Sequence, residues 1–199
     1  MAKNGTQKSQ EKAQEIYLRA AQIFFAKGYN ACSLNDIAEA LNITKAGLYY
    51  YVESKQSLLF EIINLGLDSV DNEVLEPARS ISDAETRLKF IISNHARLCA
   101  GGNHAVIIIS HETNELNFYQ REAVLKRRRD YFDFIRNTMI ELQTQGKLYD
   151  VDITTATFTI LGMILWLSRW YRPNGTMSVE KVCEDVCEMA LRGLLKGKV

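Results

Sequence analysis

Residues 33–55 read SLNDIAEALNITKAGLYYYVESK, and this stretch decides the fold of the N-terminal part of the chain. It predicts two short helices. Ser33 and Thr44 are residue types that cap helix N-termini, because their side-chain oxygens accept hydrogen bonds from amides of the first turn. Asn42, between the two helices, tolerates the left-handed backbone of a tight turn. The pattern is typical of a helix-turn-helix, whose second helix enters the major groove of DNA.

The second of these helices and the start of the next supply the groups that a DNA-binding surface needs. Lysines, hydroxyl groups and helix N-terminal amides bind phosphates, and small residues let a helix approach the base edges. A structural hairpin is the alternative, but three consecutive tyrosines on a short helix cannot all face inward. We predict DNA contacts from Ser33, Thr44, Lys45, Ala46, Gly47, Tyr49, Tyr50 and Lys55.

The composition is that of a globular protein with long helices. The chain has 199 residues, of which 47% are hydrophobic, and only two prolines interrupt it. Because Lys+Arg and Asp+Glu both number 24, a DNA-binding surface must be local. The N-terminus lacks the apolar core of a secretory signal, and no apolar run reaches a membrane-spanning length. These features predict a cytoplasmic protein with no membrane partner.

Helical periodicity continues through the rest of the chain. A first helix from Ile16 should end at Gly28, and another should run from Ser54 to an end or break at Pro77. The run 105–109 is rich in β-branched residues, but it has no partner strand, so we predict a short buried helix. Further helices are predicted at 83–100, 117–145, 154–171 and 178–194. The sequence therefore predicts an all-α fold.

Residues 16–59 resemble the TetR family of bacterial transcriptional repressors. Val52 stands where phenylalanine is usual in the family, and Glu53 where proline is common. The rest of the chain matches only in length and helix order. The positions that carry the resemblance are Phe24, Gly28, Tyr29, Ile37, Ala38, Leu48, Tyr49, Ser54, Lys55 and Leu58.

The resemblance implies an N-terminal three-helix DNA-binding domain, followed by a helical domain that binds a small molecule and homodimerises through its last two helices. We expect the first domain over residues 1–53 and the second over 54–199, with helix 54–77 as the connector. The dimer would form through about 152–171 and 178–196. In support, the stretch 158–167 is apolar nearly all round and must be covered on several sides. A helix wholly buried in a monomer is the alternative.

Polar groups set among apolar ones mark the candidate ligand pocket. His95 could instead be a hydrogen-bonded core residue. Arg169 lies between Trp166 and Trp170, which suits a carboxylate, a phosphate or a ring system, although it could also interact with the helix dipole. We predict ligand contacts from Asn94, His95, Leu98, His111, Tyr119, Met163, Trp166, Arg169 and Trp170.

The effector class rests on two further stretches. The basic run 126–129 is either a solvated helix face or a mouth that attracts an anion. The helix end 166–175 is similar to family members that regulate fatty-acid and steroid-ring degradation, several of which respond to acyl-CoA. The resemblance thus implies a palindromic double-stranded DNA operator and a small-molecule effector such as an acyl-CoA.

The function that these features predict is a ligand-responsive repressor. An activator of the same fold, and a regulator that responds to another ligand such as a drug-like cation, stay open. We predict no enzyme, because the sequence holds no Ser/His/acid set, metal-ligand spacing or glycine-rich phosphate loop. The four cysteines are expected to be buried apolar residues, with no metal site and no cofactor.

Overall fold

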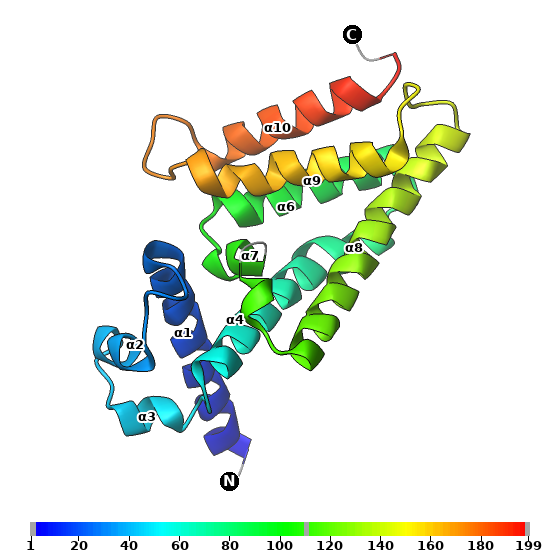
Figure 1. Ribbon diagram of the computed structural model, residues 1–199. Coiled ribbons are helices and arrows are strands. Elements are labelled where there is room, and N and C mark those ends of the chain that lie inside the picture. The colour runs from blue at the N-terminus through cyan, green and yellow to red at the C-terminus, as the bar shows by residue number, and fades with distance from the viewer. Residues whose placement is uncertain (1–2, 110–111, 198–199) are drawn as a thin grey trace. The chain divides into compact units, whose positions relative to one another are not determined.

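The computed structural model describes residues 3–109 and 112–197, and their regular structure is helical (Figure 1). The exception within these ranges is an isolated antiparallel bridge between Leu148 and Leu195. The predicted all-α fold is confirmed. The chain forms two compact units, which are Met1–Leu67 with His104–Val124, and Asp68–Asn103 with Leu125–Val199. The domain boundary expected at residue 53 stays a prediction.

The first unit is built around an apolar core shared by its helices. It contains α1 (Lys3–Lys27), α2 (Leu34–Ala40), α3 (Lys45–Tyr49), the first part of α4 (Lys55–Val70), α7 (His104–Ile109), the 3-10 turn η2 (Thr113–Glu115) and the start of α8 (Phe118–Thr144). The large side chains buried completely in this core are Phe24, Ile37, Leu48, Leu58, Leu59, Ile62 and Ile63.

Local sequence signals end and begin these helices where they were predicted to. Gly28 follows α1 with φ 84°, and Asn42 adopts φ 52° in the turn between α2 and α3. Ser33 and Asp36 form a capping box at α2, since each side chain accepts a hydrogen bond from the other's backbone N–H. Helix α3 ends at Tyr49, and Tyr50 is its C-cap.

The short helix α7 confirms the prediction for residues 105–109. Its backbone comes close to α4 because Gly66 has no side chain. A Cβ atom at Gly66 would lie 2.5 Å from the carbonyl oxygen of Ala105, which is too close for any residue other than glycine without a shift. The buried residues of α7 therefore complete the core of the first unit.

The connector helix is longer than predicted. After α4 the chain makes a π turn, η1 (Asp71–Leu75), and continues as α5 (Glu76–Arg79), so it passes Pro77. Proline donates no hydrogen bond, and in an α-helix its ring clashes with the carbonyl four residues earlier. The wider π turn, which ends two residues before Pro77, lets the helical path continue for another two residues after the proline.

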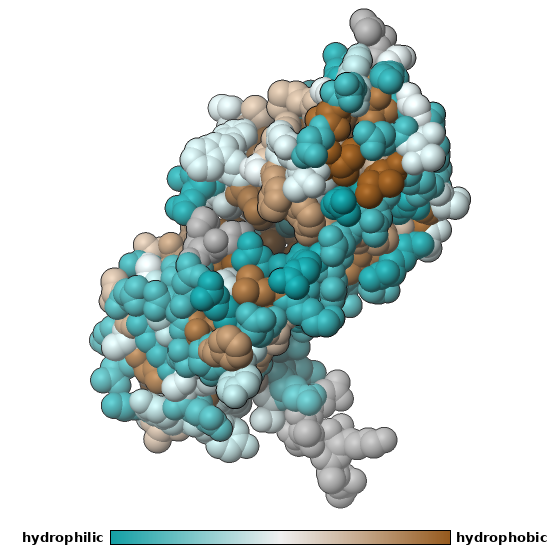
Figure 2. All heavy atoms as spheres, turned by 45° about the vertical axis from the view of Figure 1, so that its right-hand side comes forward, coloured by the Kyte–Doolittle hydropathy of each residue, from teal (hydrophilic) through white to brown (hydrophobic). Residues whose placement is uncertain are grey.

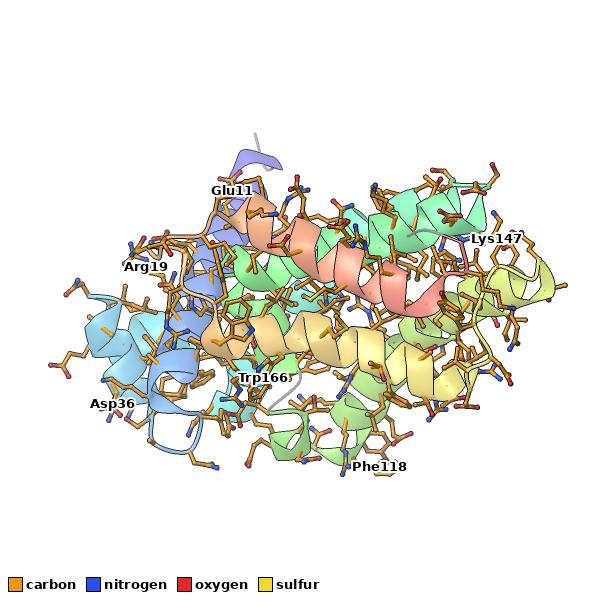
Figure 3. All side chains as sticks on the ribbon, turned by 90° about the horizontal axis from the view of Figure 1, so that it is seen from above. Glu11, Arg19, Asp36, Phe118, Lys147 and Trp166 are labelled. Atoms are coloured by element: carbon orange, nitrogen blue, oxygen red, sulfur yellow. The ribbon has the colours of Figure 1, made fainter. Side chains whose placement is uncertain are left out.

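The second unit surrounds a central helix, α6 (Ala84–Ala100), which packs against η1, α9 (Ile153–Trp170) and α10 (Val179–Leu194). α9 and α10 lie side by side in Figures 1 and 3. α6 is also tied to α8, because Arg87 Nε donates to Thr138 Oγ1 at 3.0 Å and the Arg87 guanidinium pairs with Glu141. Asp83, Asp152 and Ser178 cap α6, α9 and α10.

Apolar side chains of the last two helices remain exposed. Phe158 and Trp166 of α9 are 61% and 63% exposed, and Met189 of α10 is 59% exposed. Figure 2 shows apolar side chains at the surface in its upper part, where the C-terminal helices lie. The alternative of an α9 wholly buried in a monomer is therefore wrong. None of the helices described has the length and apolar character needed to cross a membrane.

Candidate DNA-binding surface and effector site

The recognition helix α3 is fixed by one cap and one buried side chain. Thr44 Oγ1 accepts a hydrogen bond from the Gly47 N–H at 3.0 Å. A Cβ at Gly47 would lie 3.1 Å from that same oxygen, so glycine leaves room for the cap. On the opposite side Leu48 is completely buried. Because a helix of five residues is not stable alone, these contacts hold it on the first unit.

The tyrosines that follow divide as the prediction requires. Tyr49 and Tyr50 are 44% and 75% exposed, whereas Tyr51 is half-buried and its carbonyl accepts a hydrogen bond from Tyr17 Oη at 3.5 Å. Lys45 Nζ lies 5.8 Å from the centre of the Tyr49 ring. Two phenol groups and a lysine thus point outward from the recognition helix.

A surface depression of about 360 Å³ gathers several of the predicted DNA contacts. It contains two lysines, which provide the positive charge that a phosphate needs. Four predicted residues line it, and Thr44, Ala46, Gly47 and Tyr50 do not. Asn35 was missed, because its position beside Lys45 depends on how α2 packs against α3. The lining consists of Cys32, Ser33, Leu34, Asn35, Lys45, Tyr49 and Lys55.

The side chain and the backbone N–H of Ser33 are both used in the N-cap of α2. Its Oγ–H is donated to Asp36 Oδ2 at 2.8 Å, and its backbone N–H lies at 2.8 Å from the same oxygen. These bonds lower the pKa of Asp36, the backbone bond most strongly. Ser33 therefore supports the surface by fixing the start of α2.

The start of α4 is capped reciprocally by two serines. Ser57 N–H donates to Ser54 Oγ at 3.0 Å, and Ser54 N–H donates to Ser57 Oγ at 2.9 Å. Lys55 is the first residue of this helix. Its charge thus stands at a helix N-terminus, where backbone amides favour anions.

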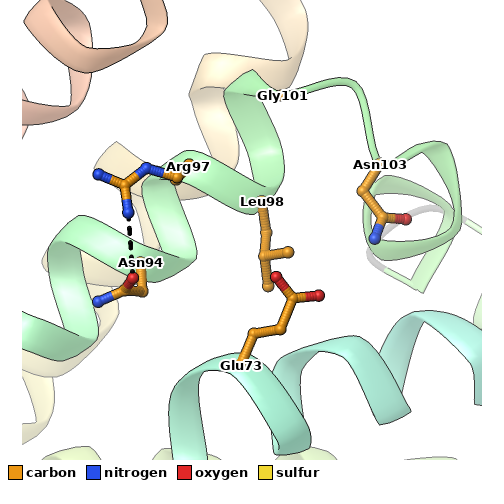
Figure 4. Close-up of a pocket in the computed structure, with 6 residues that line it drawn as sticks. All are labelled: Glu73, Asn94, Arg97, Leu98, Gly101 and Asn103. Atoms are coloured by element: carbon orange, nitrogen blue, oxygen red, sulfur yellow. Dashed lines mark hydrogen bonds between the residues drawn. The ribbon is translucent and has the colours of Figure 1, made fainter.

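In the second unit, two predicted ligand residues line a polar hollow of about 500 Å³. They are Asn94 and Leu98. Asn94 Oδ1 accepts a hydrogen bond from Arg97 at 3.3 Å, and Figure 4 shows Glu73 of η1 pointing toward Leu98. The other lining residues, Glu73, Arg97, Gly101 and Asn103, were missed because they come from a π turn and a helix end that the sequence does not bring together.

His95 faces different surroundings from its neighbour Asn94. Its Nδ1 lies 3.0 Å from Tyr131 Oη, and both side chains are buried. Burial lowers the pKa of His95 to about 4 and raises the pKa of Tyr131, so both groups are neutral at pH 7. The hydrogen bond to Tyr131 makes His95 a hydrogen-bonded residue of the core. Contact between His95 and a ligand stays a prediction.

The remaining predicted ligand residues lie elsewhere. Met163, Trp166 and Trp170 share one face of α9, with Arg169 beside them; Trp166, labelled in Figure 3, and Trp170 are 63% and 48% exposed. Tyr119 belongs to the first unit and is 83% exposed. His111 lies outside the described residues.

The four cations of the run 126–129 have different surroundings. Lys126 pairs with Asp130 of the same helix at 2.8 Å. Arg127 Nη2 lies 2.7 Å from Asp68 and 2.5 Å from Asp71, so it joins α8 to the connector. Within residues 3–109 and 112–197, Arg128 makes no ion pair; its side chain is exposed, and desolvation by the surrounding protein lowers the pKa of its guanidinium. Arg129 is exposed. The run is therefore neither a uniform solvated face nor a uniform anion site.

The four cysteines are buried and free, as predicted. Burial raises the pKa of Cys99 to about 12, so its thiol is unreactive at neutral pH.

Known protein families match both the N-terminal and the C-terminal part of the chain. The family described as "Bacterial regulatory proteins, tetR family" matches residues 16–62, and the "Tetracyclin repressor-like, C-terminal domain" matches residues 82–194.

Two relatives cover most of the chain. The transcriptional repressor KstR2 of Rhodococcus jostii is 28% identical over 178 residues, which are 88% of this chain and 87% of the relative. The crystal structure of AibR in complex with isovaleryl coenzyme A and operator DNA has 32% identity and a TM-score of 0.83, and the match covers 89% of this chain and 96% of AibR. KstR2 of Mycobacterium tuberculosis, at 21% identity and a TM-score of 0.87, shares the fold over 94% of this chain and 96% of its own.

Proposed function

Because the chain belongs to the TetR family of bacterial regulatory proteins, we propose that it is a homodimeric transcriptional repressor that a coenzyme A thioester releases from operator DNA. The observation that carries the DNA-binding part is the depression beside α3, in which Lys45 and Lys55 converge. Two ammonium groups and the N-terminus of α4 suit a backbone phosphate. The residues that would lie toward the major groove are Thr44, Ala46, Gly47 and Tyr50. The phosphate would be bordered by Ser33 and Tyr49.

The dimer would form through the exposed apolar faces of α9 and α10. Phe158, Trp166 and Met189 are the large apolar side chains that a partner would cover. A two-fold axis would place two α3 helices about 34 Å apart, in successive major grooves of a palindromic site.

DNase footprinting on the DNA upstream of its own gene tests the DNA-binding part. We expect two protected half-sites, related by a two-fold axis and separated by about one helical turn. Equal affinity for this DNA and for a scrambled duplex at moderate salt would contradict it. Reporter output after deletion of the gene distinguishes the repressor from an activator, since transcription should rise.

Two observations support the effector part of the proposal. One is the similarity of the chain to AibR and KstR2, and the other is the exposed end of α9. AibR was crystallised with isovaleryl coenzyme A and operator DNA. In this chain Arg169 stands beside Trp166 and Trp170, and aromatic rings with a guanidinium suit an adenine ring and phosphates. We keep Met163 in this site, and Asn94, His95, Leu98, His111 and Tyr119 as further proposed contacts. A drug-like cation remains the rival effector.

Arg128 is the residue of the basic run best suited to a phosphate of the thioester. Among the four cations, only Arg128 combines a pKa lowered by desolvation with the absence of an ion pair in the described part of the chain. Replacing Arg128 with methionine should raise the thioester concentration needed for operator release about tenfold or more, since a hydrogen bond to a charged group contributes about 1.5–3 kcal/mol. Fluorescence anisotropy of labelled operator measures it.

The matched control is Arg129→Met, which removes the same charge from the next position of α8, where the side chain is also exposed. We expect it to leave effector release within twofold of the wild type. Equal shifts in the two variants would mean that only the general positive charge of α8 matters, and Arg128 would lose its assigned role.

We propose that the protein regulates transcription and is not an enzyme, and that it acts in the cytoplasm, where bacterial operator DNA lies.

A further inference from the structure

Lys55 of the DNA-binding surface is seated on an aromatic ring. Its Nζ lies 4.1 Å from the centre of the Tyr29 ring. Tyr29 is only 7% exposed and packs edge-on against Phe24, with ring centres 5.1 Å apart. A cation over an aromatic face is attracted by the ring quadrupole, and a lysine held this way loses less rotamer entropy when it binds phosphate. Tyr29 thus preorganises the ammonium group beside the depression that Lys55 lines.

Glu115 of η2 accepts hydrogen bonds from the residues that follow Tyr29 and Lys55 in the chain. The Glu115 backbone carbonyl accepts a hydrogen bond from Gln56 Nε2 at 2.7 Å, and its carboxylate accepts one from Asn30 Nδ2 at 3.4 Å. Asn30 follows Tyr29, and Gln56 follows Lys55. Glu115 therefore ties the turn that carries the ring to the helix start that carries the lysine.

The segment around Glu115 is itself firmly held in the first unit. Leu116 is 6% exposed in the apolar core, and Thr113 Oγ1 donates to the Ile109 carbonyl at 2.6 Å. Burial raises the pKa of the Tyr29 phenol, and the negative charges of Glu115 and Glu112 raise it further.

We propose that Glu115 and Gln56 form a latch that positions Lys55 for a DNA phosphate, so that η2 (Thr113–Glu115) sets operator affinity. Lys55 would touch DNA, whereas Tyr29, Gln56 and Glu115 are positioning residues. The inference rests on the proposed function, because it assumes that Lys55 binds operator phosphate. It assigns regulation of that surface to a segment remote in sequence from the helix-turn-helix.

A double-mutant cycle on the full-length protein tests the latch. Operator affinity is measured by fluorescence anisotropy for the wild type, Gln56→Ala, Lys55→Ala and the double variant. We expect Gln56→Ala to weaken binding about 3- to 10-fold, the range for one hydrogen bond. In the Lys55→Ala background, the same change should weaken it less than twofold, because Gln56 acts through Lys55.

Gln120→Ala is the matched control, because it removes the same kind of side-chain amide from a different place. Gln120 Oε1 accepts a hydrogen bond from Asn117 N–H at the start of α8, away from the contact between Gln56 and Glu115. Its operator affinity should equal that of the wild type. The latch is overturned if Gln56→Ala has no effect, or if it weakens binding by the same factor with and without Lys55. If the wild type itself shows no preference for operator DNA, the proposed function fails instead.

Two variants of Tyr29 separate its ring from its packing. Tyr29→Phe keeps the ring and should bind operator within twofold of the wild type. Tyr29→Leu removes the ring and should lose affinity about as Lys55→Ala does, in protein that circular dichroism shows to be folded. Equal affinities for the Phe and Leu variants would overturn the role of the ring.

Discussion

Replacing Leu48 with alanine is expected to abolish operator binding while the C-terminal helices stay folded and dimeric. α3 has five residues, too few for a stable isolated helix, and Leu48 is its completely buried side chain. The cavity left by a Leu→Ala change costs about 2–5 kcal/mol. The backbone carbonyl of residue 48, which accepts the N–H groups of Tyr51 and Val52 at 2.9 and 3.1 Å, is kept by alanine, so the substitution tests the buried side chain.

Fluorescence anisotropy with labelled operator measures operator binding, circular dichroism measures folding, and native mass spectrometry measures dimerisation. Tyr50→Ala is the control, because Tyr50 is 75% exposed. The Tyr50→Ala variant should keep the melting temperature and lose only the affinity of one DNA contact. Wild-type affinity in the Leu48→Ala variant would show that α3 does not read the operator.

Replacing Phe158 with aspartate is expected to convert the dimer into a monomer and to abolish operator binding with it. Phe158 is 61% exposed in the single chain, and its ring lies 4.6 Å from that of Phe132. If a partner covers this side chain, each interface acquires two buried carboxylates, one from each protomer. Loss of such an anchor raises the dimer dissociation constant about a hundredfold or more. A monomer presents one recognition helix and loses the second half-site.

Analytical ultracentrifugation measures the dimer constant directly. Phe118→Asp introduces the same charge at a phenylalanine that is 72% exposed, at the start of α8 and outside the proposed interface (labelled in Figure 3). This control should stay dimeric. A Phe158→Asp protein that remains a dimer at nanomolar concentration would mean that α9 does not form the interface.

Features controlled by neighbouring residues were predictable from the sequence. The caps at Ser33 and Thr44 and the left-handed turn at Asn42 depend on side chains and backbone within three residues. The exposure of Tyr49 and Tyr50 followed from the limited space around a short helix. These local rules define the helix-turn-helix almost completely.

Features that depend on distant packing were not predictable. The π turn before Pro77 appears in the sequence only as a break signal. Asn94 and His95 are adjacent, yet one lines a polar hollow and the other is buried against Tyr131. The partners of Arg127 lie more than fifty residues away, so the basic run could not be resolved into its members.

The central claim is that a coenzyme A thioester releases this protein from its operator. The most direct test is anisotropy of labelled operator bound by the wild-type protein, titrated with isovaleryl coenzyme A and a panel of longer and ring-bearing acyl-CoA thioesters, with free coenzyme A as control. We expect at least one thioester to lower operator affinity tenfold or more, and free coenzyme A to have a much smaller effect, because a ligand shifts the equilibrium only by its differential affinity for the two states. Operator affinity unchanged by every thioester at saturating concentration would contradict the claim.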